Sequence, residues 1–470
     1  MPYSRGSGYA PRRGRGGWDQ TFTRPKKVFV QPDLDKNPLG PLLKTIVIAD
    51  LDDDSNIASS TRPIAHVRYI ASYNWCSDAS NTNTILVPGM PPRWTPLQDP
   101  QRLAVDSGQY YRDPNAARYP AYPLVPVVQA VLHIHPDFPT RDIDMVACGS
   151  TLGNLLRFVR GQDKPFRFAV QAIGNTVFFL RKESDPRELI PNVRGYGHSF
   201  PEAYTTWDRD VKGSETHQRI IQYVFGGFKC LVRFACDGYI KEEASSIKVS
   251  VSRKDSMKHP EDEILSAFDT VSINKATIPK QSDTERVSLD QKGAEVSQDG
   301  IFDLKTRSSR HKAGIDMSDI IPQLWVKQIP WFIVAYHDGA GLFEDIRIKD
   351  VQDDVRKWEA DNISAIRSLA VVLRQIIAFA RTEGGLLEVY SPRKDCLEIR
   401  RQHGEGEHVL PLELREMWAN EELSDPDDGG LELDQEGSSD RYWPVDSDDD
   451  ELDYTACSAE DCGYCGKCKY

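Results

Sequence analysis

The sequence predicts a mixed α/β or α+β core in which helices flank a central sheet. Two strand-like runs, residues 166–173 and 176–182, are joined through Gly174-Asn175, a dipeptide typical of tight hairpin turns. A long amphipathic pattern extends from Asp353 to Thr382, with isoleucines and leucines at helical spacing. Because strands and helices occur together in one region, we expect a sheet covered by helices.

The other elements of the core, which extends from about Leu42 to Glu416, follow from the same patterns. An apolar stripe ending at Gly226-Gly227 predicts a helix from Ser214 to Phe225. Residues 317–328 are also predicted to be helical. Strands are predicted at residues 45–49, 230–236, 301–307, 330–337 and 342–348.

Charge is distributed unevenly along the 470 residues, whose formal net charge is −13. Residues 421–456 carry 15 acidic side chains against Arg441 alone, so the remaining chain sums to +1. Residues 1–30 hold seven arginines and lysines against Asp19 alone. The protein is therefore predicted to have a basic head and an acidic tail.

These shifts in composition predict four regions. Residues 1–40 form a disordered RGG-like basic arm, whose guanidinium and indole groups suit RNA binding; a plain solubilising tail is the alternative. Residues 41–420 form the folded core, interrupted by a polar segment at 243–298 that we interpret as a flexible insertion. Residues 421–456 form an acidic disordered linker, and residues 457–470 a cysteine-rich tail.

The tail contains four cysteines in a Cys-x4-Cys-x2-Cys-x2-Cys array, namely Cys457, Cys462, Cys465 and Cys468. Four thiolates at this spacing can close a tetrahedral Zn²⁺ site, and zinc is the favoured metal. An iron-sulfur cluster or unliganded thiols are the alternatives. The array is predicted to be a tethered module that binds a protein partner or folds back on the basic arm.

The chain has no run of about 18 apolar residues and no apolar N-terminal signal segment. The other five cysteines stand singly, as buried free thiols do, so a disulfide framework is not expected. We therefore expect a soluble intracellular protein of the nucleus or cytoplasm, with no membrane partner.

A possible catalytic pattern lies in two apolar strands. The segment FACDG ends in Asp237-Gly238, and GIFDLKTR carries Asp303 and Lys305 two positions apart. Period-two alternation places Asp303 and Lys305 on one face of a strand, where a carboxylate that holds a divalent ion lies beside an ammonium that orients water. The same Asp-x-Lys pattern recurs at residues 210–212 and 290–292, so it is weak by itself.

The order of the segments resembles the DXO and Rai-type family of RNA 5′-end decapping exonucleases, a branch of the PD-(D/E)xK nuclease fold. The resemblance covers residues 143–351 and rests on five segments: IDMVACGSTLGNLLRF with the hairpin that follows it, RGYGHSFPEAY, FACDG, FDLKT and IPQLWVKQIPWFIVAYHDG. It implies a nuclease-like mixed sheet flanked by helices.

The resemblance also implies roles for individual residues. Glu202, Asp237, Asp303 and the Leu304 carbonyl would hold Mg²⁺ or Mn²⁺. Lys305 would stabilise the attacking hydroxide, and Gln323 would position the substrate. Two positions depart from the family pattern: Ala235 stands where the family has glutamate, and Cys148-Gly149 stands where it has an arginine.

These features of the sequence leave three alternative functions. A divergent metal-dependent nuclease that processes or decaps RNA 5′ ends, with weakened, altered or absent hydrolysis, is the first. A catalytically inactive pseudo-nuclease that binds RNA is the second. The third arises because SYNW, VPGMPPRW and CGYCGKC also resemble filamentous-fungal proteins that sometimes carry a geranylgeranyl diphosphate synthase label. Its aspartate-rich motif has one formal match, at residues 449–453 in the acidic tail.

Overall fold

The computed structural model describes residues 32, 34–51, 63–76, 83–182, 185–190, 193–241, 287–309, 315 and 317–419. The predicted basic arm up to residue 31, most of the predicted insertion, the acidic linker and the four tail cysteines lie outside these residues. Within the part that the structure describes, the predicted class of a mixed sheet flanked by helices is confirmed.

Eleven strands form the larger sheet, in the order β1-β17-β16-β6-β7-β5-β10-β9-β2-β3-β12. Their bounds are β1 Leu42–Val47, β2 Ala65–Cys76, β3 Thr84–Gly89, β5 Met145–Cys148, β6 Phe166–Ile173, β7 Thr176–Arg181, β9 Ser214–Phe225, β10 Phe228–Cys236, β12 Ser288–Gly293, β16 Leu386–Arg393 and β17 Cys396–Arg401. Strand β5 is parallel to both of its neighbours, β7 and β10, whereas β9 is antiparallel to both of its own.

Six strands form the smaller sheet, in the order β15-β14-β13-β11-β4-β8. Their bounds are β4 Arg93–Trp94, β8 Thr205–Thr206, β11 Gly238–Tyr239, β13 Ile301–Ser308, β14 Trp331–His337 and β15 Phe343–Asp350. A single residue, Asp237, separates the end of β10 in the larger sheet from the start of β11 in the smaller one. The two sheets therefore meet at one of the predicted site residues.

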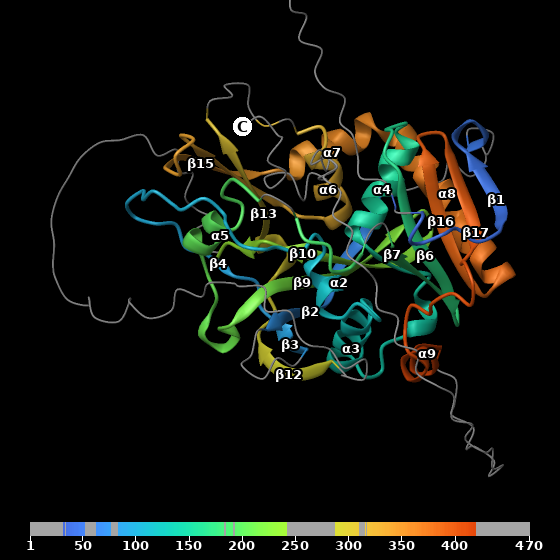
Figure 1. Ribbon diagram of the computed structural model, residues 1–470. Coiled ribbons are helices and arrows are strands. Elements are labelled where there is room, and N and C mark those ends of the chain that lie inside the picture. The colour runs from blue at the N-terminus through green and yellow to red at the C-terminus, as the bar shows by residue number, and fades with distance from the viewer. Residues whose placement is uncertain are drawn as a thin grey trace, which may run out of the picture.

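Helices cover both faces of the larger sheet (Figure 1). Their bounds are α2 Pro114–Arg118, α3 Val125–Ile134, α4 Gly149–Val159, α5 Ser199–Tyr204, α6 Ile320–Lys327, α7 Gln352–Asp361, α8 Ile363–Glu383 and α9 Leu412–Ala419; short 3-10 turns occur at Ile48–Leu51, Thr140–Asp142, Arg209–Val211 and Gln298–Gly300. Side chains of α4, α6 and α8 share one hydrophobic cluster with the sheet, and those of α3 and α9 share a second cluster on the other face.

The segment from Ser214 to Phe225 is a strand, β9, and the predicted helix there is wrong. Strand β9 pairs with β10 on one side and β2 on the other, so it is central in the sheet. Nearly all of its side chains are buried, because both faces of the sheet are covered. The second half of the strand, IIQYVF, has apolar residues without period-two alternation, and this imitated a helical stripe. The glycines Gly226 and Gly227 form the turn to β10 and do not end a helix.

The predicted hairpin through Gly174-Asn175 is confirmed by the antiparallel pairing of β6 with β7. The predicted single helix from Asp353 to Thr382 is instead two helices, α7 and α8, separated at Asn362. The Asn362 side chain donates to the Trp358 carbonyl at 2.8 Å. An asparagine that bonds to the preceding turn favours a helix end, which explains the break.

The end of the predicted insertion is ordered. Residues 288–293 form strand β12, which pairs in parallel with β3 at the edge of the larger sheet. Most of its side chains are exposed, since an edge strand has a partner on one side only. Its polar composition therefore concealed it among the residues that we interpreted as a flexible segment.

Helix α8 is long and apolar enough to cross a membrane by length and composition, with a mean hydropathy of 1.7. Half of its most apolar window is nevertheless buried inside the protein. Ile366, Leu369 and Leu373 belong to the cluster shared with the larger sheet. The helix therefore has the packing of a core helix.

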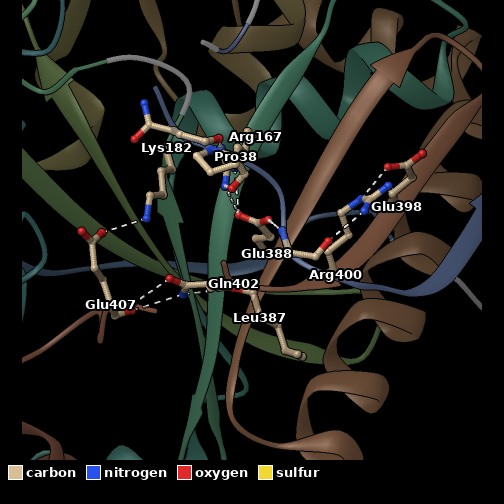
Figure 2. A network of polar contacts seen from close by, with 11 residues as sticks. Pro38, Arg167, Lys182, Leu387, Glu388, Glu398, Arg400, Gln402 and Glu407 are labelled. Atoms are coloured by element: carbon tan, nitrogen blue, oxygen red, sulfur yellow. Dashed lines mark hydrogen bonds and ion pairs between the residues drawn. The ribbon is translucent and has the colours of Figure 1, made fainter. Parts of the chain in front are cut away.

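A buried ion pair fastens the first described segment of the chain to the far edge of the larger sheet (Figure 2). Arg167 on β6 pairs with Glu388 on β16, and their side chains are 3% and 0% exposed. Arg167 also donates to the carbonyls of Asn37 at 2.5 Å and Pro38 at 3.3 Å. Glu388 accepts from the Gly40 amide at 3.3 Å. In the larger sheet, β7 and β5 separate β6 and β16 from β10, the strand that ends next to Asp237 (Figure 1).

Candidate active site

Asp237 lies where the chain leaves β10 and enters β11. Its carboxylate accepts a hydrogen bond of 2.7 Å from the Leu304 amide on β13. Burial and the negative charge of Asp303 raise the pKa of Asp237 to about 6. The structure therefore brings the two predicted aspartates together.

Asp303 and Lys305 lie on one face of β13, as their spacing predicts, and form an ion pair of 3.0 Å. Their side chains are 7% and 11% exposed. Burial by itself would raise the pKa of Asp303, but Lys305 and Lys327 together lower it below its usual value. Burial opposes the charge of Lys305, yet Asp303 and Asp237 raise the pKa of this ammonium. Both groups are therefore charged at neutral pH.

Lys327 completes this cluster, and the sequence analysis missed it. It is the last residue of α6, and its ammonium lies 3.3 Å from the second carboxylate oxygen of Asp303. Its side chain is 5% exposed. A lysine at the end of the apolar helix IIPQLWVK was the available signal, because buried lysines need a partner.

Gln323, the predicted substrate-positioning residue, lies one turn before Lys327 on α6. It is buried against Gly153 of α4, where a β-carbon would come within 2.9 Å of its side-chain amide. Among the described residues that line the cavity beside Asp303, Lys327 is present and Gln323 is absent. In this structure Gln323 therefore belongs to the helix packing behind the site.

Glu202 lies on α5 and lines the same cavity as Asp237 and Asp303. Asp106 fixes the start of α5, since its carboxylate accepts from the amides of His198 and Ser199 at 3.0 and 2.8 Å. Burial and the charge of Asp106 raise the pKa of Glu202. Within the described part of the chain, no group of three or more histidine, cysteine and acidic side chains is arranged to hold a metal. Glu202 thus shares the cavity but does not close a three-carboxylate cluster.

The cavity has a volume of about 380 Å³, and its wall combines five basic and five acidic side chains with apolar and aromatic ones. Besides the cluster, it is lined by the basic and aromatic residues Tyr111, Arg112, Arg181, Trp207 and Arg233. Arg233 on β10 donates to the Gln218 side chain at 2.8 Å. Ala235, two residues further along β10, is exposed in this cavity. The wall therefore combines cations, carboxylates and aromatic rings, of which the cations can pair with phosphates and the rings can stack on bases.

A comparison with protein families matches residues 46–418 to the domain of unknown function DUF8563. The chain belongs to this family. No curated protein matches the chain.

Several solved structures are similar to this DUF8563 chain at low identity. One is Scheffersomyces stipitis Rai1 in complex with (3′-NADP)+ and calcium, with 11% identity, a TM-score of 0.49, and coverage of 82% of this chain and 99% of that one. A mutant S. pombe Rai1 in complex with 3′-FADP has 11% identity, a TM-score of 0.46, and coverage of 77% and 99%. K. lactis Dxo1 in complex with manganese has 9% identity, a TM-score of 0.41, and coverage of 81% and 99%.

The oxygen atoms around Asp237 are of the kinds that bind hard divalent ions. Strand β11 pairs with β13 only as far as Phe302, so Leu304 lies beyond that ladder. The Leu304 amide points to Asp237, and in an extended strand the carbonyl of a residue points to the same side as its amide. Asp237, Asp303 and the Leu304 carbonyl therefore offer the ligand types that Mg²⁺ and Mn²⁺ prefer. The predicted Zn²⁺ or iron-sulfur ligands lie outside the described residues.

Proposed function

We propose that this chain is a divergent metal-dependent nuclease that acts on RNA 5′ ends. The observation that supports this most is the Asp303–Lys305 ion pair beside Asp237, in the wall of a cavity that also contains arginines and aromatic rings. Composition and segment order add to it, since the acidic and lysine residues occur in the sequence order of the family that the chain resembles.

Side chains that line the cavity could bind the phosphate and stabilise the charge that develops during the reaction. Arg181 and Arg233 face the cavity and offer guanidinium groups for the oxygens of a phosphate. Lys305 is held charged by Asp303, so it can stabilise the negative charge that develops on the phosphorus centre. Asp237, Asp303 and the Leu304 carbonyl would hold the divalent ion, which would act as a Lewis acid toward the same phosphate.

The experiment uses the full chain, Mn²⁺ and RNA with a 5′-monophosphate or an incomplete cap. Wild type should degrade the RNA, and Asp303→Asn should lower the rate by about 100-fold or more, because it removes one charge of the ion pair. The matched control is Asp290→Asn. It changes the same pattern in β12, where Asp290 and Lys292 pair on the exposed edge, and should leave the rate within about twofold. Equal RNA decay in wild type and Asp303→Asn would contradict the proposal.

A second proposal is an inactive pseudo-nuclease that binds RNA in the same cavity. Ala235 supports it, because an exposed methyl group cannot act as a metal ligand at this point of the wall. It predicts that Arg233→Ala weakens RNA binding by about tenfold while no variant or metal produces cleavage. Unchanged RNA binding by Arg233→Ala would contradict it.

Prenyl transfer receives no support from the core. Prenyl synthases need aspartate-rich motifs on facing helices of a helical bundle, whereas the described core is built on two sheets. The one formal match, at residues 449–453, lies outside the described residues.

A further inference from the structure

Asp303 is held between two ammonium groups that come from different elements. Lys305 on β13 lies 3.0 Å from one carboxylate oxygen, and Lys327 on α6 lies 3.3 Å from the other. All three side chains are buried: the exposed fraction is 7% for Asp303, 11% for Lys305 and 5% for Lys327. Both oxygens that a divalent ion would use on this residue are thus already next to a positive charge.

Two glycines bring the helix of Lys327 close to the site. Gly149 and Gly153 are four residues apart on α4, and Gln323 and Lys327 are four residues apart on α6, so each pair lies on one helix face. A β-carbon on Gly149 would lie 3.5 Å from the Lys327 Cγ, and one on Gly153 would lie 2.9 Å from the Gln323 amide. The missing side chain at Gly153 therefore leaves the space that the Gln323 amide occupies, and Gly149 lies in contact with the stem of Lys327.

The backbone at Lys327 is fixed as well. The Gln298 side chain donates to the carbonyls of Lys327 and Gln328 at 3.3 and 2.9 Å, and so satisfies the end of α6. Gln298 is itself held by fully buried Arg219, whose Nε donates to it at 2.7 Å. The end of the helix, with its partial negative charge, also favours a cation there. Lys327 is therefore positioned from both its backbone and its stem.

The charges of the cluster balance without any metal. Asp237 and Asp303 contribute two negative charges, and Lys305 and Lys327 contribute two positive charges. Ala235, which is exposed in the same cavity, adds none. A divalent ion that enters here must therefore displace or repel an ammonium before it can use both oxygens of Asp303.

We propose that Lys327 is a resident cation of this site, which occupies the Asp303 oxygen that a divalent ion would otherwise bind and so weakens metal binding. The inference deepens the proposed function, on which it rests for the identity of the site. When an ion binds Asp303, the displaced ammonium of Lys327 faces the cavity, where it can pair with a phosphate oxygen of the substrate.

Mn²⁺ binding to the full chain, followed by electron paramagnetic resonance, tests this without any substrate. Mn²⁺ is chosen because the tail thiolates prefer softer metals. Lys327→Met should bind Mn²⁺ at least about tenfold more tightly than wild type, because a nearby positive charge is removed. Lys229→Met is the matched control: it removes the same charge from an exposed lysine that pairs with Asp142 at 2.9 Å, and should bind as wild type does.

Two further variants keep the test decisive. Lys327→Gln retains a hydrogen-bond donor without the charge, so it should also tighten Mn²⁺ binding if Lys327→Met does not fold. Adding Asp303→Asn to either variant should abolish the gain, which separates this site from weak binding by the acidic tail. Mn²⁺ affinities of both folded Lys327 variants within twofold of Lys229→Met would overturn the inference.

The outcome is distinguishable from failure of the proposed function. If Lys327→Met tightens Mn²⁺ binding and no variant cleaves RNA, the resident cation stands and the nuclease proposal fails. If wild type cleaves RNA and the Lys327 variants leave Mn²⁺ affinity unchanged, the nuclease proposal stands and the resident cation fails.

Discussion

The pattern Asp-x-Lys occurs on two described strands with opposite surroundings. On β12, Asp290 and Lys292 pair at 3.3 Å with side chains about half exposed, 50% and 53%. On β13, Asp303 and Lys305 pair at 3.0 Å with side chains 7% and 11% exposed. Strand β12 is the edge of its sheet, whereas β13 lies between β14 and β11. The same residues are therefore a solvated ion pair in one place and part of a buried cluster in the other.

The difference teaches that the chemistry of such a pattern comes from its neighbours. The β13 pair has a second carboxylate, Asp237, and a second ammonium, Lys327, within the same cavity. Asp237 lies between β10 and β11, 66 residues before Asp303, and Lys327 lies on α6, 24 residues after it. Variants of the two pairs should consequently behave very differently.

The largest expected contrast is in stability. Asp303→Ala leaves the two buried ammonium groups without their shared partner, and should lower the free energy of unfolding by about 3–5 kcal/mol. Asp290→Ala removes one half-exposed ion pair and should change it by less than about 0.5 kcal/mol. Urea unfolding followed by tryptophan fluorescence measures both. Similar losses of unfolding free energy in the two variants would show that the β13 cluster is as exposed to solvent as the ion pair on the edge strand β12.

The second contrast concerns the helix cover that β13 has and β12 lacks. Gly149→Leu forces a side chain against the stem of Lys327 and should cost about 1–3 kcal/mol of stability. Gly149→Ala is the control, because its β-carbon would be at ordinary contact distance, 3.5 Å. The double variant Gly149→Leu with Lys327→Ala should recover part of the loss, with a coupling of about 1 kcal/mol in unfolding measurements. If the stability losses of Gly149→Leu and Lys327→Ala add without coupling, the two side chains are not in contact.

The third contrast is in pH dependence. Burial lowers the pKa of His198 in the cavity wall to about 3, so the folded protein keeps this imidazole neutral. The unfolded chain binds a proton near pH 6.5 and the folded chain does not, so stability is present above pH 6.5 and is lost as the pH falls toward 3. Between pH 7.5 and 5.5 the loss from this residue should be about 1.4 kcal/mol.

Thermal unfolding across that range measures the loss. His198→Phe, which retains a ring against Tyr110, should reduce the slope with pH. The exposed His133→Gln is the control and should leave the slope unchanged. An identical slope in His198→Phe and wild type would contradict the assignment of the neutral imidazole.

The smallest expected effect comes from removing the charges of the β13 cluster together. Asp237→Asn and Asp303→Leu combined with Lys305→Met and Lys327→Met remove both carboxylates and both ammonium groups, and should leave stability within about 1 kcal/mol of wild type. Unfolding in urea measures this, and RNA cleavage should be lost. A severe loss of stability in this fourfold variant would mean that the charges themselves hold the fold.

The sequence predicted the local parts of the site well. Asp303 and Lys305 share a strand face because alternation is a property of any extended chain, and Asp237 follows a strand that its apolar residues define. The hairpin of β6 and β7 depends on a turn of two residues, so it was also predictable. Each of these features is determined within about ten residues.

The parts that were missed depend on distant neighbours. Strand β9 looked like a helix because burial on both faces removes the alternation that marks a strand. Lys327 meets Asp303 only through the packing of α4 on α6, which no local pattern encodes. Gln323 was assigned to the site by resemblance; the structure packs its side chain on Gly153, and its role in positioning the substrate stays a prediction.

The ion pair of Arg167 with Glu388 has a consequence for the order in which the protein folds during synthesis. It joins residues 221 positions apart, and the Gly40 amide that Glu388 binds is 348 positions away from it. Among the described strands, β1 pairs with β17 alone, and β17 ends at Arg401, so the first and last of these strands lie side by side (Figure 1). The N-terminal edge of the sheet therefore has no partner until almost the whole core has left the ribosome. Contacts of this sequence separation slow folding, and a nascent chain that stops before residue 396 would expose β1 as an unpaired edge.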